Sequence, residues 1–280
     1  MELRPLAAID PDFLASFAHD PEFSDPMLTS EDQRRRNLRA ALEHPEHHAV
    51  LGTFRGGKQT GLFVFLALRE EKYLELLAGL SRDSEAYEAV LSHLAKAYPG
   101  WSADFVFNPR NHLLASALRQ RNAGFYPEQQ KMVFSGAFSP VSTDGIFPFS
   151  QEHAAAYFAI HEKDAYWTGE KVAAAPNQFR ILLALSGGKV IGYLDVTHGL
   201  PENEPYDLFV LEAYRRKGYG RKLLAAALEA NGSAGMSLLV DKENLPARNL
   251  YASMGFHRIE GADSLTVHWQ IPAGESFFPE

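Results

Sequence analysis

Residues 214–224 read YRRKGYGRKLL, with five basic side chains in positions 215–222, two glycines between them and two leucines directly after. The run PYDLFV, residues 205–210, comes just before and has the length and composition of a strand. The leucines open an amphipathic run that ends at Gly232, the residue type most common just past a helix. This segment therefore predicts a strand, a basic turn and a helix in direct succession.

The basic turn falls where the expected helix begins, and a helix N-terminus leaves backbone N–H groups unpaired and carries partial positive charge. Glycine lets the backbone approach a ligand closely, and Arg and Lys side chains add formal charge. The turn therefore predicts a phosphate or pyrophosphate site, with a solvated basic turn as the alternative. Its spacing, Arg215-x-x-Gly218-x-Gly220, is neither that of a P-loop nor that of a dinucleotide-binding glycine loop.

Composition excludes several classes of protein. A chain of 280 residues with 46% hydrophobic and 22% charged residues is typical of a soluble globular protein and suffices for two domains. The absence of cysteine excludes disulfides, thiolate nucleophiles and cysteine-ligated metals, and the histidines of HPEHH (44–48) match no standard metal motif, so we expect no metal. A formal charge of −8 argues against nucleic-acid binding. With no signal-like N-terminus and no membrane-spanning apolar run, we expect a cytoplasmic protein without membrane contact.

The two halves of the chain repeat the same order of expected elements. Each contains two strands joined by a Gly-Gly turn, FRGGKQTGLF at 54–63 and LSGGKVIGYL at 185–194. Each later carries a helix that starts after an Asn and runs into Gly-Phe. We therefore predict a duplicated α/β (α+β) domain, with boundaries 1–138 and 139–280. Two unrelated domains in succession are the alternative.

The segment DLFVLEAYRRKGYGRKLL, residues 207–224, resembles the acyl-CoA signature of the GNAT superfamily of N-acyltransferases: a strand ending in Val, a short acidic-aromatic bridge, and Arg-x-x-Gly-x-Gly opening a helix. A second GNAT signature follows downstream in ENLPARNLYASMGF, residues 243–256. The resemblance covers residues from about 143 to 270, and the first half shares only the order of elements. It implies two tandem GNAT-like domains, each a mixed, mostly antiparallel sheet with a splayed parallel strand pair and flanking helices.

The resemblance also implies acetyl-CoA as the co-substrate and assigns its contacts. The backbone of the signature strand would face the acetyl and pantetheine amides, at Leu208, Phe209 and Val210. The N–H groups from Arg216 to Lys222 would hold the pyrophosphate, and the basic side chains would meet the phosphates. The turn residues so assigned are Arg215, Arg216, Lys217, Gly218, Tyr219, Gly220, Arg221 and Lys222, and the second signature adds Asn244, Ala247 and Arg248.

Four residues are candidates for proton transfer. Tyr251 stands where the family commonly has a phenol near the CoA sulfur, and a phenol there can protonate the departing thiolate. Attack by an amine also needs a proton acceptor. The signature strand offers Glu204 and Asp207, on opposite faces if the strand alternates, and the end of the preceding strand offers His198. A packing aromatic and two solvated carboxylates are the alternatives. The candidate acceptor-binding residues are Tyr166, Trp167 and His198, which are otherwise structural aromatics and a surface histidine.

The first half departs from the family pattern at the position of the basic turn. Its strand YLELLAGL, residues 73–80, runs into SRDSEAYEAV, which lacks Gly-x-Gly and brings Asp83, Glu85 and Glu88 to the helix start. Acidic residues there stabilise the helix dipole themselves and would repel a pyrophosphate. We therefore predict that the first domain is a degenerate copy without a cofactor site, acting as scaffold or as part of the acceptor pocket.

The sequence thus predicts an N-acetyltransferase that moves an acetyl group from acetyl-CoA to a primary amine of a small molecule or peptide. The reaction would proceed by direct attack in a ternary complex, without a covalent enzyme intermediate. Two alternatives remain open at this point. One is a non-catalytic module that senses CoA or binds a protein, and the other is an acyltransferase that uses a longer acyl-CoA.

Overall fold

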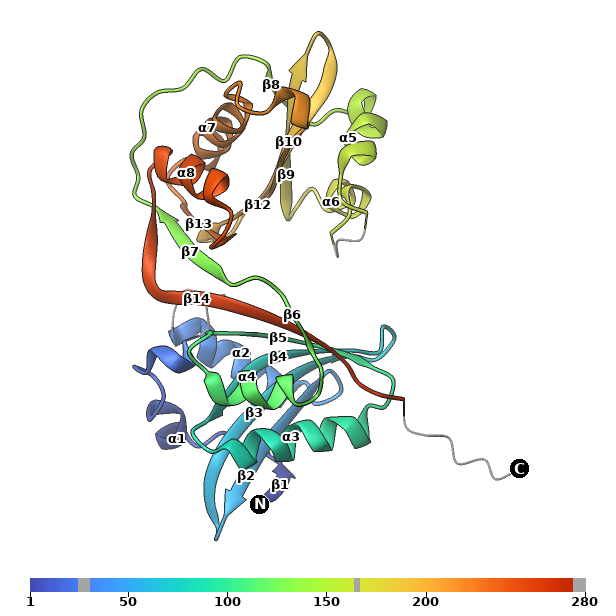
Figure 1. The fold of residues 1–280 in the computed structure, drawn as a ribbon, viewed down its shortest axis with the longest axis vertical. Coiled ribbons are helices and arrows are strands. Elements are labelled where there is room, and N and C mark those ends of the chain that lie inside the picture. The colour runs from blue at the N-terminus through green and yellow to red at the C-terminus, as the bar shows by residue number, and fades with distance from the viewer. Residues whose placement is uncertain (25–30, 164–166, 274–280) are drawn as a thin grey trace, which may run out of the picture. The chain divides into compact units, whose positions relative to one another are not determined.

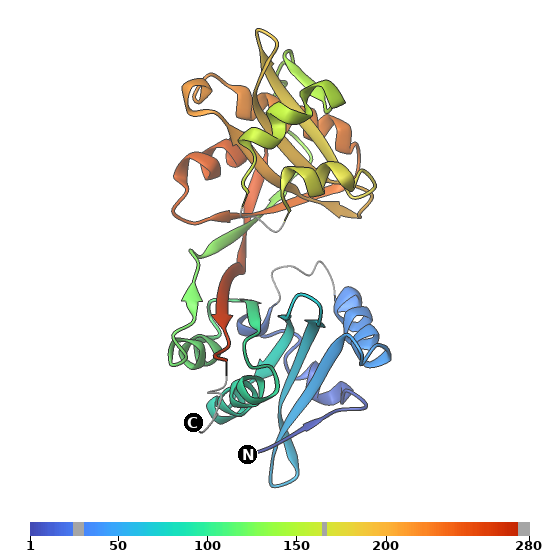
Figure 2. The same cartoon turned by 90° about the vertical axis from the view of Figure 1, so that its right-hand side faces the viewer.

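The protein divides into two compact units, which Figures 1 and 2 show in two views. The computed structural model describes residues 1–24, 31–163 and 167–273. The first unit comprises residues 1–130 and 260–280, and the second comprises residues 131–259. Each unit is mixed α/β with helices packed on both faces of its strands, as the sequence predicts. Among the described residues, no helix is both long and apolar enough to cross a membrane.

The strands of the first unit follow the order β1-β2-β3-β4-β5-β14, with β6 also paired to β14. They are β1 (Glu2–Pro5), β2 (His48–Arg55), β3 (Lys58–Leu68), β4 (Tyr73–Ser81), β5 (Ser102–Phe107), β6 (Gly124–Phe125) and β14 (Phe256–Gln270). The pairs are antiparallel except β4–β5, whose parallel pairing ends at Leu76 and Phe105. Because β4 continues to Ser81, the two strands splay apart beyond this point.

Alternation along β3 explains why helices cover both faces of this sheet. Phe63 and Phe65 are buried with α3 and α4, whereas Leu62 and Val64 are buried with α1, η1 and α2. Figure 2 shows the two groups of helices on opposite sides of the strands. The helices are α1 (Pro11–Ala15), η1 (Pro21–Phe23), α2 (Glu31–Glu43), α3 (Ser84–Ala97) and α4 (His112–Arg119).

The second unit contains a four-stranded antiparallel sheet in the order β12-β10-β9-β8. Its strands are β8 (Ile146–Pro148), β9 (Phe179–Ser186), β10 (Lys189–Thr197) and β12 (Pro205–Val210). A further set pairs in the order β7-β13-β11, with β7 (Gln129–Phe134), β11 (Glu202–Asn203) and β13 (Gly235–Asp241). One face packs against α5 (Ala154–Ile160), which η2 (Gln151–His153) precedes, and α6 (Gly169–Ala174). The other face packs against η3 (Glu212–Tyr214), α7 (Tyr219–Asn231) and α8 (Leu245–Ser253).

A splayed parallel pair is also present in the second unit. β11 runs parallel to β13 at Glu202 and Asn203, and the chain then leaves β13 and continues as β12 at the end of the four-stranded sheet. Among the described residues, β12 pairs only with β10. The other edge of β12 therefore has free backbone groups beside the gap.

The compact units differ from the predicted boundary in their terminal strands. We predicted residues 131–138 in the first domain and residues 260–280 in the second, and the units hold them the other way round. β14 is one continuous strand rather than the two closing strands expected, and its second half pairs with β5 from Leu265 to Gln270. β7 instead pairs with β13. Buried Val267 and Trp269 complete the core of the first unit, so the edge of β5 is closed by the last strand of the chain.

Candidate active site

The predicted strand, basic turn and helix are present as β12, η3 and α7. Gly218 is the N-cap of α7 and adopts φ +88°, and Arg216 also lies in the left-handed region at φ +60°. Such backbone is easiest for glycine. A Cβ added at Gly218 would meet no atom within 4 Å, so the left-handed backbone rather than crowding favours glycine there.

The start of α7 presents a run of unused amide groups, residues 216–221, which we call the amide loop. Within the described part of the chain, none of these six N–H groups donates a hydrogen bond. No side chain caps the helix either. Lys222, which the resemblance included, donates its N–H to the Gly218 carbonyl at 3.1 Å and is not available. Converging free N–H groups at a helix start form an anion site.

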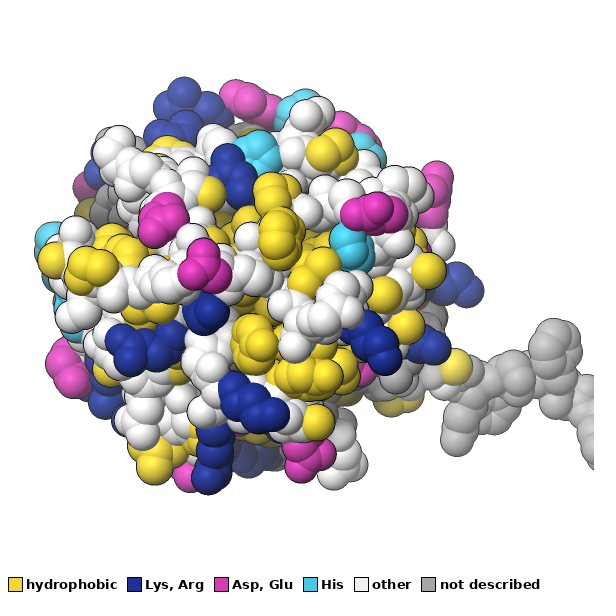
Figure 3. All heavy atoms as spheres, turned by 90° about the horizontal axis from the view of Figure 1, so that it is seen from above, with side chains coloured by type: hydrophobic (Ala, Val, Ile, Leu, Met, Phe, Trp, Pro, Cys, Tyr) yellow, Lys and Arg dark blue, Asp and Glu magenta, His cyan; other side chains and the backbone are white. Residues whose placement is uncertain are grey.

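The basic side chains around the amide loop have different roles. Arg215 turns back, and its Nε donates to the Val210 carbonyl at 2.9 Å, which fixes the turn to the end of β12. Lys222 Nζ donates to the Asp144 carbonyl at 2.9 Å. Arg216, Lys217 and Arg221 are exposed and carry the positive charge at the surface. Lys and Arg side chains are prominent in the lower half of Figure 3, which looks onto one end of the second unit.

The second signature forms α8, which packs beside the amide loop. Asn244 is its N-cap and accepts from the Ala247 N–H at 3.1 Å, while Arg248 Nη1 donates to the Lys242 carbonyl at 2.7 Å. A Cβ at Gly220 would lie 3.2 Å from Leu250 Cδ2. The two signature motifs therefore meet at Gly220, and glycine permits this close approach.

Tyr251 is a buried aromatic of α8 and packs edge-on against Phe256 at 5.8 Å. Burial, followed by the negative charges of Asp207 and Glu204, raises the pKa of Tyr251 to about 12. Within the described residues its hydroxyl has no hydrogen-bond partner. The phenol therefore keeps its proton throughout the neutral range and has a free donor.

An open pocket of about 420 Å³ lies against the other face of β12. Its described lining consists of Ile160, His161, Glu162, Lys163, Tyr193, Asp207 and Phe209. Asp207 and Phe209 belong to one face of β12, whereas Leu208 and Val210 pack with α7 and α8 on the opposite face. We call this cavity the β12 pocket. It and the amide loop lie on the two faces of one strand, whose free edge borders the splay.

Asp207 is the predicted carboxylate that lines the β12 pocket. Its side chain is 33% exposed, and Oδ2 accepts from the Tyr193 hydroxyl at 2.6 Å. Glu204 is instead partly buried at the splay, where the Leu239 backbone hydrogen-bonds its carboxylate. Burial raises the pKa of Glu204, although the Leu239 hydrogen bond and the charge of Lys131 oppose the shift. Glu204 precedes β12, and the register of the β10–β12 ladder shifts between Asp207 and Pro205, so simple alternation does not relate the two carboxylates.

The predicted acceptor-binding residues do not gather at the β12 pocket. Trp167 packs edge-on against Phe179 at 4.9 Å in the core, and it is absent from the pocket's described lining. His198 Nε2 lies 2.7 Å from the Pro176 carbonyl in an exposed turn and is likewise absent from that lining. Tyr166 lies outside the described residues.

Beneath the pocket lies a buried cluster that sequence reasoning missed. Asp195 is fully buried, and the Tyr157 hydroxyl, which lies 2.9 Å from both of its oxygens, donates its one proton to the carboxylate. His161 Nε2 lies 2.9 Å from Asp195 Oδ2 and 3.7 Å from Asp207 Oδ2. One signal was available in the sequence: Asp195 is the only charged residue in the apolar run VIGYLDV, residues 190–196. A carboxylate buried in such a strand is rarely left unpaired.

This group also fits the description of a possible metal site, because His161, Asp195 and Asp207 offer ligand atoms within 4.8 Å of one another. The hydrogen bonds, however, use the same atoms. His161 Nε2 is hydrogen-bonded to Asp195 Oδ2. The Tyr157 hydroxyl donates to Asp195, and the Tyr193 hydroxyl donates to Asp207. The geometry is therefore that of a hydrogen-bonded network.

The first unit begins its corresponding helix in another way. Asp83 is the N-cap of α3, and its carboxylate accepts from the Glu85 N–H at 3.0 Å. Ser81 Oγ accepts from the Asp83 N–H at 3.0 Å. Arg55 bridges Asp83 and Glu85 at 2.8 and 2.9 Å. The helix start is thus satisfied by the chain's own oxygens, and its carboxylates oppose an anion.

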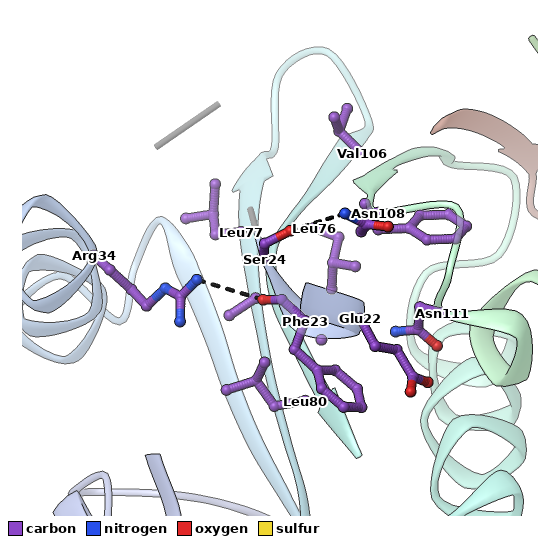
Figure 4. A pocket seen from close by; sticks show the side chains of 13 residues that line it. Glu22, Phe23, Ser24, Arg34, Leu76, Leu77, Leu80, Val106, Asn108 and Asn111 are labelled. Carbon is purple, nitrogen blue, oxygen red and sulfur yellow. Dashed lines mark hydrogen bonds between the residues drawn. The ribbon is translucent and has the colours of Figure 1, made fainter. Parts of the chain in front are cut away.

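The splay between β4 and β5 in the first unit is filled by residues 22–24 (Figure 4). Phe23 is buried there, and Arg34 Nη2 donates to its carbonyl at 3.4 Å. Asn108 Nδ2 donates to Ser24 Oγ at 2.8 Å, as the dashed line in Figure 4 marks. The cavity that remains is about 40 Å³, enough for a few water molecules at most.

Comparison with known proteins agrees with this architecture. Residues 177–258 match the acetyltransferase (GNAT) domain family. Among solved structures, a GCN5-related N-acetyltransferase from Sphaerobacter thermophilus superposes with a TM-score of 0.58 at 14% identity, covering 84% of this chain and 86% of that one. A tandem GNAT protein from the clavulanic acid biosynthesis pathway, solved without AcCoA, superposes with a TM-score of 0.56 at 16% identity, covering 98% and 99%.

Two curated proteins are related in sequence. The mycothiol acetyltransferase of Amycolatopsis mediterranei is 32% identical over 120 residues, which are 38% of this chain and 40% of that protein. An uncharacterized protein of Mycobacterium leprae is 27% identical over 172 residues, 59% of this chain and 45% of that protein. The matched segments thus span less than half of either relative. Residues 177–258 therefore match a GNAT acetyltransferase domain, and the solved structures share the fold of the chain.

Proposed function

We propose that the second unit transfers an acetyl group from acetyl-CoA to a primary amine of a small molecule, by direct attack in a ternary complex. The observation that carries the proposal is the placement of the amide loop and the β12 pocket on opposite faces of one strand with a free edge. A phosphate-bearing substrate on one face and an amine on the other could meet at that edge. The mycothiol acetyltransferase relative supports a small-molecule acceptor.

The amide loop fits the anionic end of acetyl-CoA. Its six free N–H groups would hold the pyrophosphate, and the exposed Arg216, Lys217 and Arg221 would surround the phosphates. The free edge of β12 would pair with the amides of the pantetheine arm. In this assignment Arg215 and Lys222 shape the turn, because their side chains already bond to backbone carbonyls.

Asp207 is the group placed to accept the acceptor's proton. The neutral amine attacks the thioester carbonyl, the C–N bond forms, the C–S bond breaks, and the amine loses one proton. Oδ1 of Asp207 has no hydrogen bond within the described residues, and it belongs to a side chain that faces the β12 pocket. On the opposite side, the Tyr251 phenol would donate to the departing thiolate. With a pKa of about 12 it stays protonated and stabilises the developing negative charge through its hydrogen bond.

Initial rates of CoA release with a panel of small primary amines test the proposal, with the acceptor of the mycothiol acetyltransferase relative included in the panel. We expect turnover with at least one amine and loss of about 10²-fold or more in kcat for Asp207→Asn. Tight acetyl-CoA binding without turnover on any amine would favour the non-catalytic CoA-sensing module. A preference for longer acyl-CoA donors over acetyl-CoA would favour the third candidate activity.

A further inference from the structure

His161 is held in one orientation beneath the β12 pocket. It follows α5 directly, and its side chain is 2% exposed. The ring stacks on Tyr193, with 4.8 Å between centroids and 13° between planes, and meets Tyr157 edge-on at 5.3 Å. α6 begins against the same side chain, because a Cβ at Gly169 would lie 3.2 Å from His161 Cβ. The ring is therefore packed from three sides.

Both ring nitrogens of His161 face oxygen acceptors. Nδ1 lies 3.2 Å from the Glu162 carbonyl oxygen, and Nε2 lies 2.9 Å from Asp195 Oδ2. A carbonyl oxygen only accepts, so Nδ1 carries a proton. His161 Nε2 and Asp195 Oδ2 then share one further proton in the hydrogen bond between them. His161 and Asp195 thus form a buried pair whose protonation is tied together.

Burying the Asp195 carboxylate costs folding free energy, and packing does not explain why an acidic residue stands there. It sits in β10 between Leu194 and Val196, which are both buried. A buried carboxylate destabilises a fold unless it is paired and hydrogen-bonded, and an apolar side chain would serve packing better. Here the carboxylate is hydrogen-bonded to the Tyr157 hydroxyl and to His161 Nε2. Its role is therefore to hold the His161 ring and its proton.

The pair is coupled to Asp207 through one carboxylate oxygen. Oδ2 of Asp207 accepts from the Tyr193 hydroxyl and lies 3.7 Å from His161 Nε2. The Tyr193 ring is fixed by its stack on His161 and by the edge of Tyr157 at 5.2 Å. The direction of the Tyr193–Asp207 hydrogen bond thus depends on His161. Oδ1 of Asp207 is left for the pocket.

We propose that His161, anchored by Asp195, is a positioning residue for acetyl transfer: it aims Asp207 through Tyr193 so that one carboxylate oxygen is free to accept the proton of the amine. The inference rests on the proposed function, because it needs Asp207 as the proton acceptor. His161 touches no reacting atom in this scheme. It acts through the hydroxyl of Tyr193, whose ring stacks on the imidazole.

The electrostatic surroundings favour a protonated His161. Burial acts to lower the pKa of His161, but the hydrogen bond to Asp195, the Glu162 carbonyl and the charges of Asp195 and Asp207 outweigh it, and the pKa is raised. The titratable or charged groups around the ring are Tyr157, Tyr193, Asp195 and Asp207, with Glu162 and Lys163 at the pocket wall.

The test is the Asp195→Asn variant in the full chain, which keeps the shape of the anchor and replaces its carboxyl group with an amide. We expect kcat to fall about tenfold with the KM for acetyl-CoA unchanged, since a positioning residue supplies part of the 10²–10⁴-fold effect of a general base. Nuclear magnetic resonance should show the His161 imidazole titrating at lower pH than in the wild type. His257→Gln is the matched control, because His257 is exposed in the same unit and is not among the described residues that line the β12 pocket.

Folding and function are separated in the same experiment. The number of acetyl-CoA molecules bound per chain measures the fraction of each preparation that is folded. The value of kcat is then calculated per molecule that binds acetyl-CoA. If Asp195→Asn does not fold, Tyr157→Phe removes one hydrogen bond from Asp195 while keeping the ring, and we expect a smaller loss of kcat in the same direction. A kcat within twofold of the wild type in the folded variant, or an unchanged His161 titration, overturns the proposal.

The Asp207→Asn background distinguishes failure of this inference from failure of the proposed function. If His161 acts through Asp207, adding Asp195→Asn to Asp207→Asn causes no further loss of kcat. Fully additive losses overturn the positioning role and leave Asp207 as the base. An active Asp207→Asn enzyme overturns the base assignment, and with it the positioning role, whatever the His161 titration shows.

Discussion

Two helices in this molecule follow a splayed strand, and they begin in opposite ways. α3 starts with Asp83 bonded to a backbone N–H and with Arg55 joining two carboxylates. α7 starts with Gly218 and six N–H groups that donate to nothing in the described chain. The beginning of α3 is complete by itself, whereas α7 leaves donors for a ligand. A helix N-terminus binds an anion only when the chain does not cap it with its own oxygens.

The cavities beside these two helices also differ: the one in the first unit is small, and the one in the second unit is large. In the first unit, Phe23 and Ser24 fill the splay and leave about 40 Å³. In the second, a pocket of about 420 Å³ opens beside β12 and is lined by Asp207. The first unit thus fills its splay with its own side chains, whereas the second leaves an open pocket beside its splayed strand.

The largest effect is expected from Gly220→Glu. A side chain there meets Leu250, and its charge faces the position of the pyrophosphate, so we expect the Kd for acetyl-CoA to rise about 100-fold or more. Isothermal titration calorimetry measures the Kd. Ala230→Glu adds the same charge at the exposed far end of α7 and should bind as the wild type does. Retained binding by Gly220→Glu would contradict the amide loop as the cofactor site.

Tyr251→Phe is expected to have the next largest effect. The ring keeps its packing against Phe256, and only the free hydroxyl is lost. We expect kcat to fall about tenfold or more, with the Kd for acetyl-CoA unchanged, because the hydroxyl acts on the leaving thiolate. Steady-state rates and calorimetry on the same preparations give both values. Unchanged kcat would make Tyr251 a packing residue.

Asp83→Ala sharpens the other side of the comparison. Loss of an N-cap costs about 1 kcal/mol of unfolding free energy, and Arg55 also loses one of its partners. Urea unfolding should show this loss, while kcat and the Kd for acetyl-CoA stay at wild-type values. A change in cofactor affinity would mean that the start of α3 takes part in binding and is not a scaffold.

The smallest effect concerns pH. The raised pKa of His161 means that the folded state binds its proton more tightly, so this stabilisation is fully present below about pH 6.5 and is lost as the pH rises through the folded value. Hydrogen exchange of the β10 amides should therefore show the second unit less stable at pH 8 than at pH 6. In Asp195→Asn the difference should shrink, and in His257→Gln it should persist. An equal difference in all three proteins would show that His161 does not cause the loss of stability between pH 6 and pH 8.

The local part of the site could be predicted from the sequence. The strand, the turn and the start of α7 follow one another within residues 205–222, and their glycines and charges act over short range. The turn of Arg215 toward the Val210 carbonyl could not be predicted, because a basic side chain in a loop reads equally as a phosphate ligand. The unavailable N–H of Lys222 follows from helix geometry that a motif does not specify.

The nonlocal part was beyond sequence reasoning. His161 and Asp195 lie 34 positions apart, and only the packing of α5 on β10 brings them together. The terminal strands behave similarly. The sequence of β14 does not specify that its second half pairs with β5, because strand pairing depends on partners far along the chain.

The most direct test of the account is the stoichiometry of acetyl-CoA binding to the full chain, measured by calorimetry on the wild type and on Gly220→Glu. The account predicts one molecule bound per chain and none in the variant, because the amide loop is open and the start of α3 is capped. Two molecules per chain, or one molecule retained by Gly220→Glu, would contradict the distinction between the two helix starts.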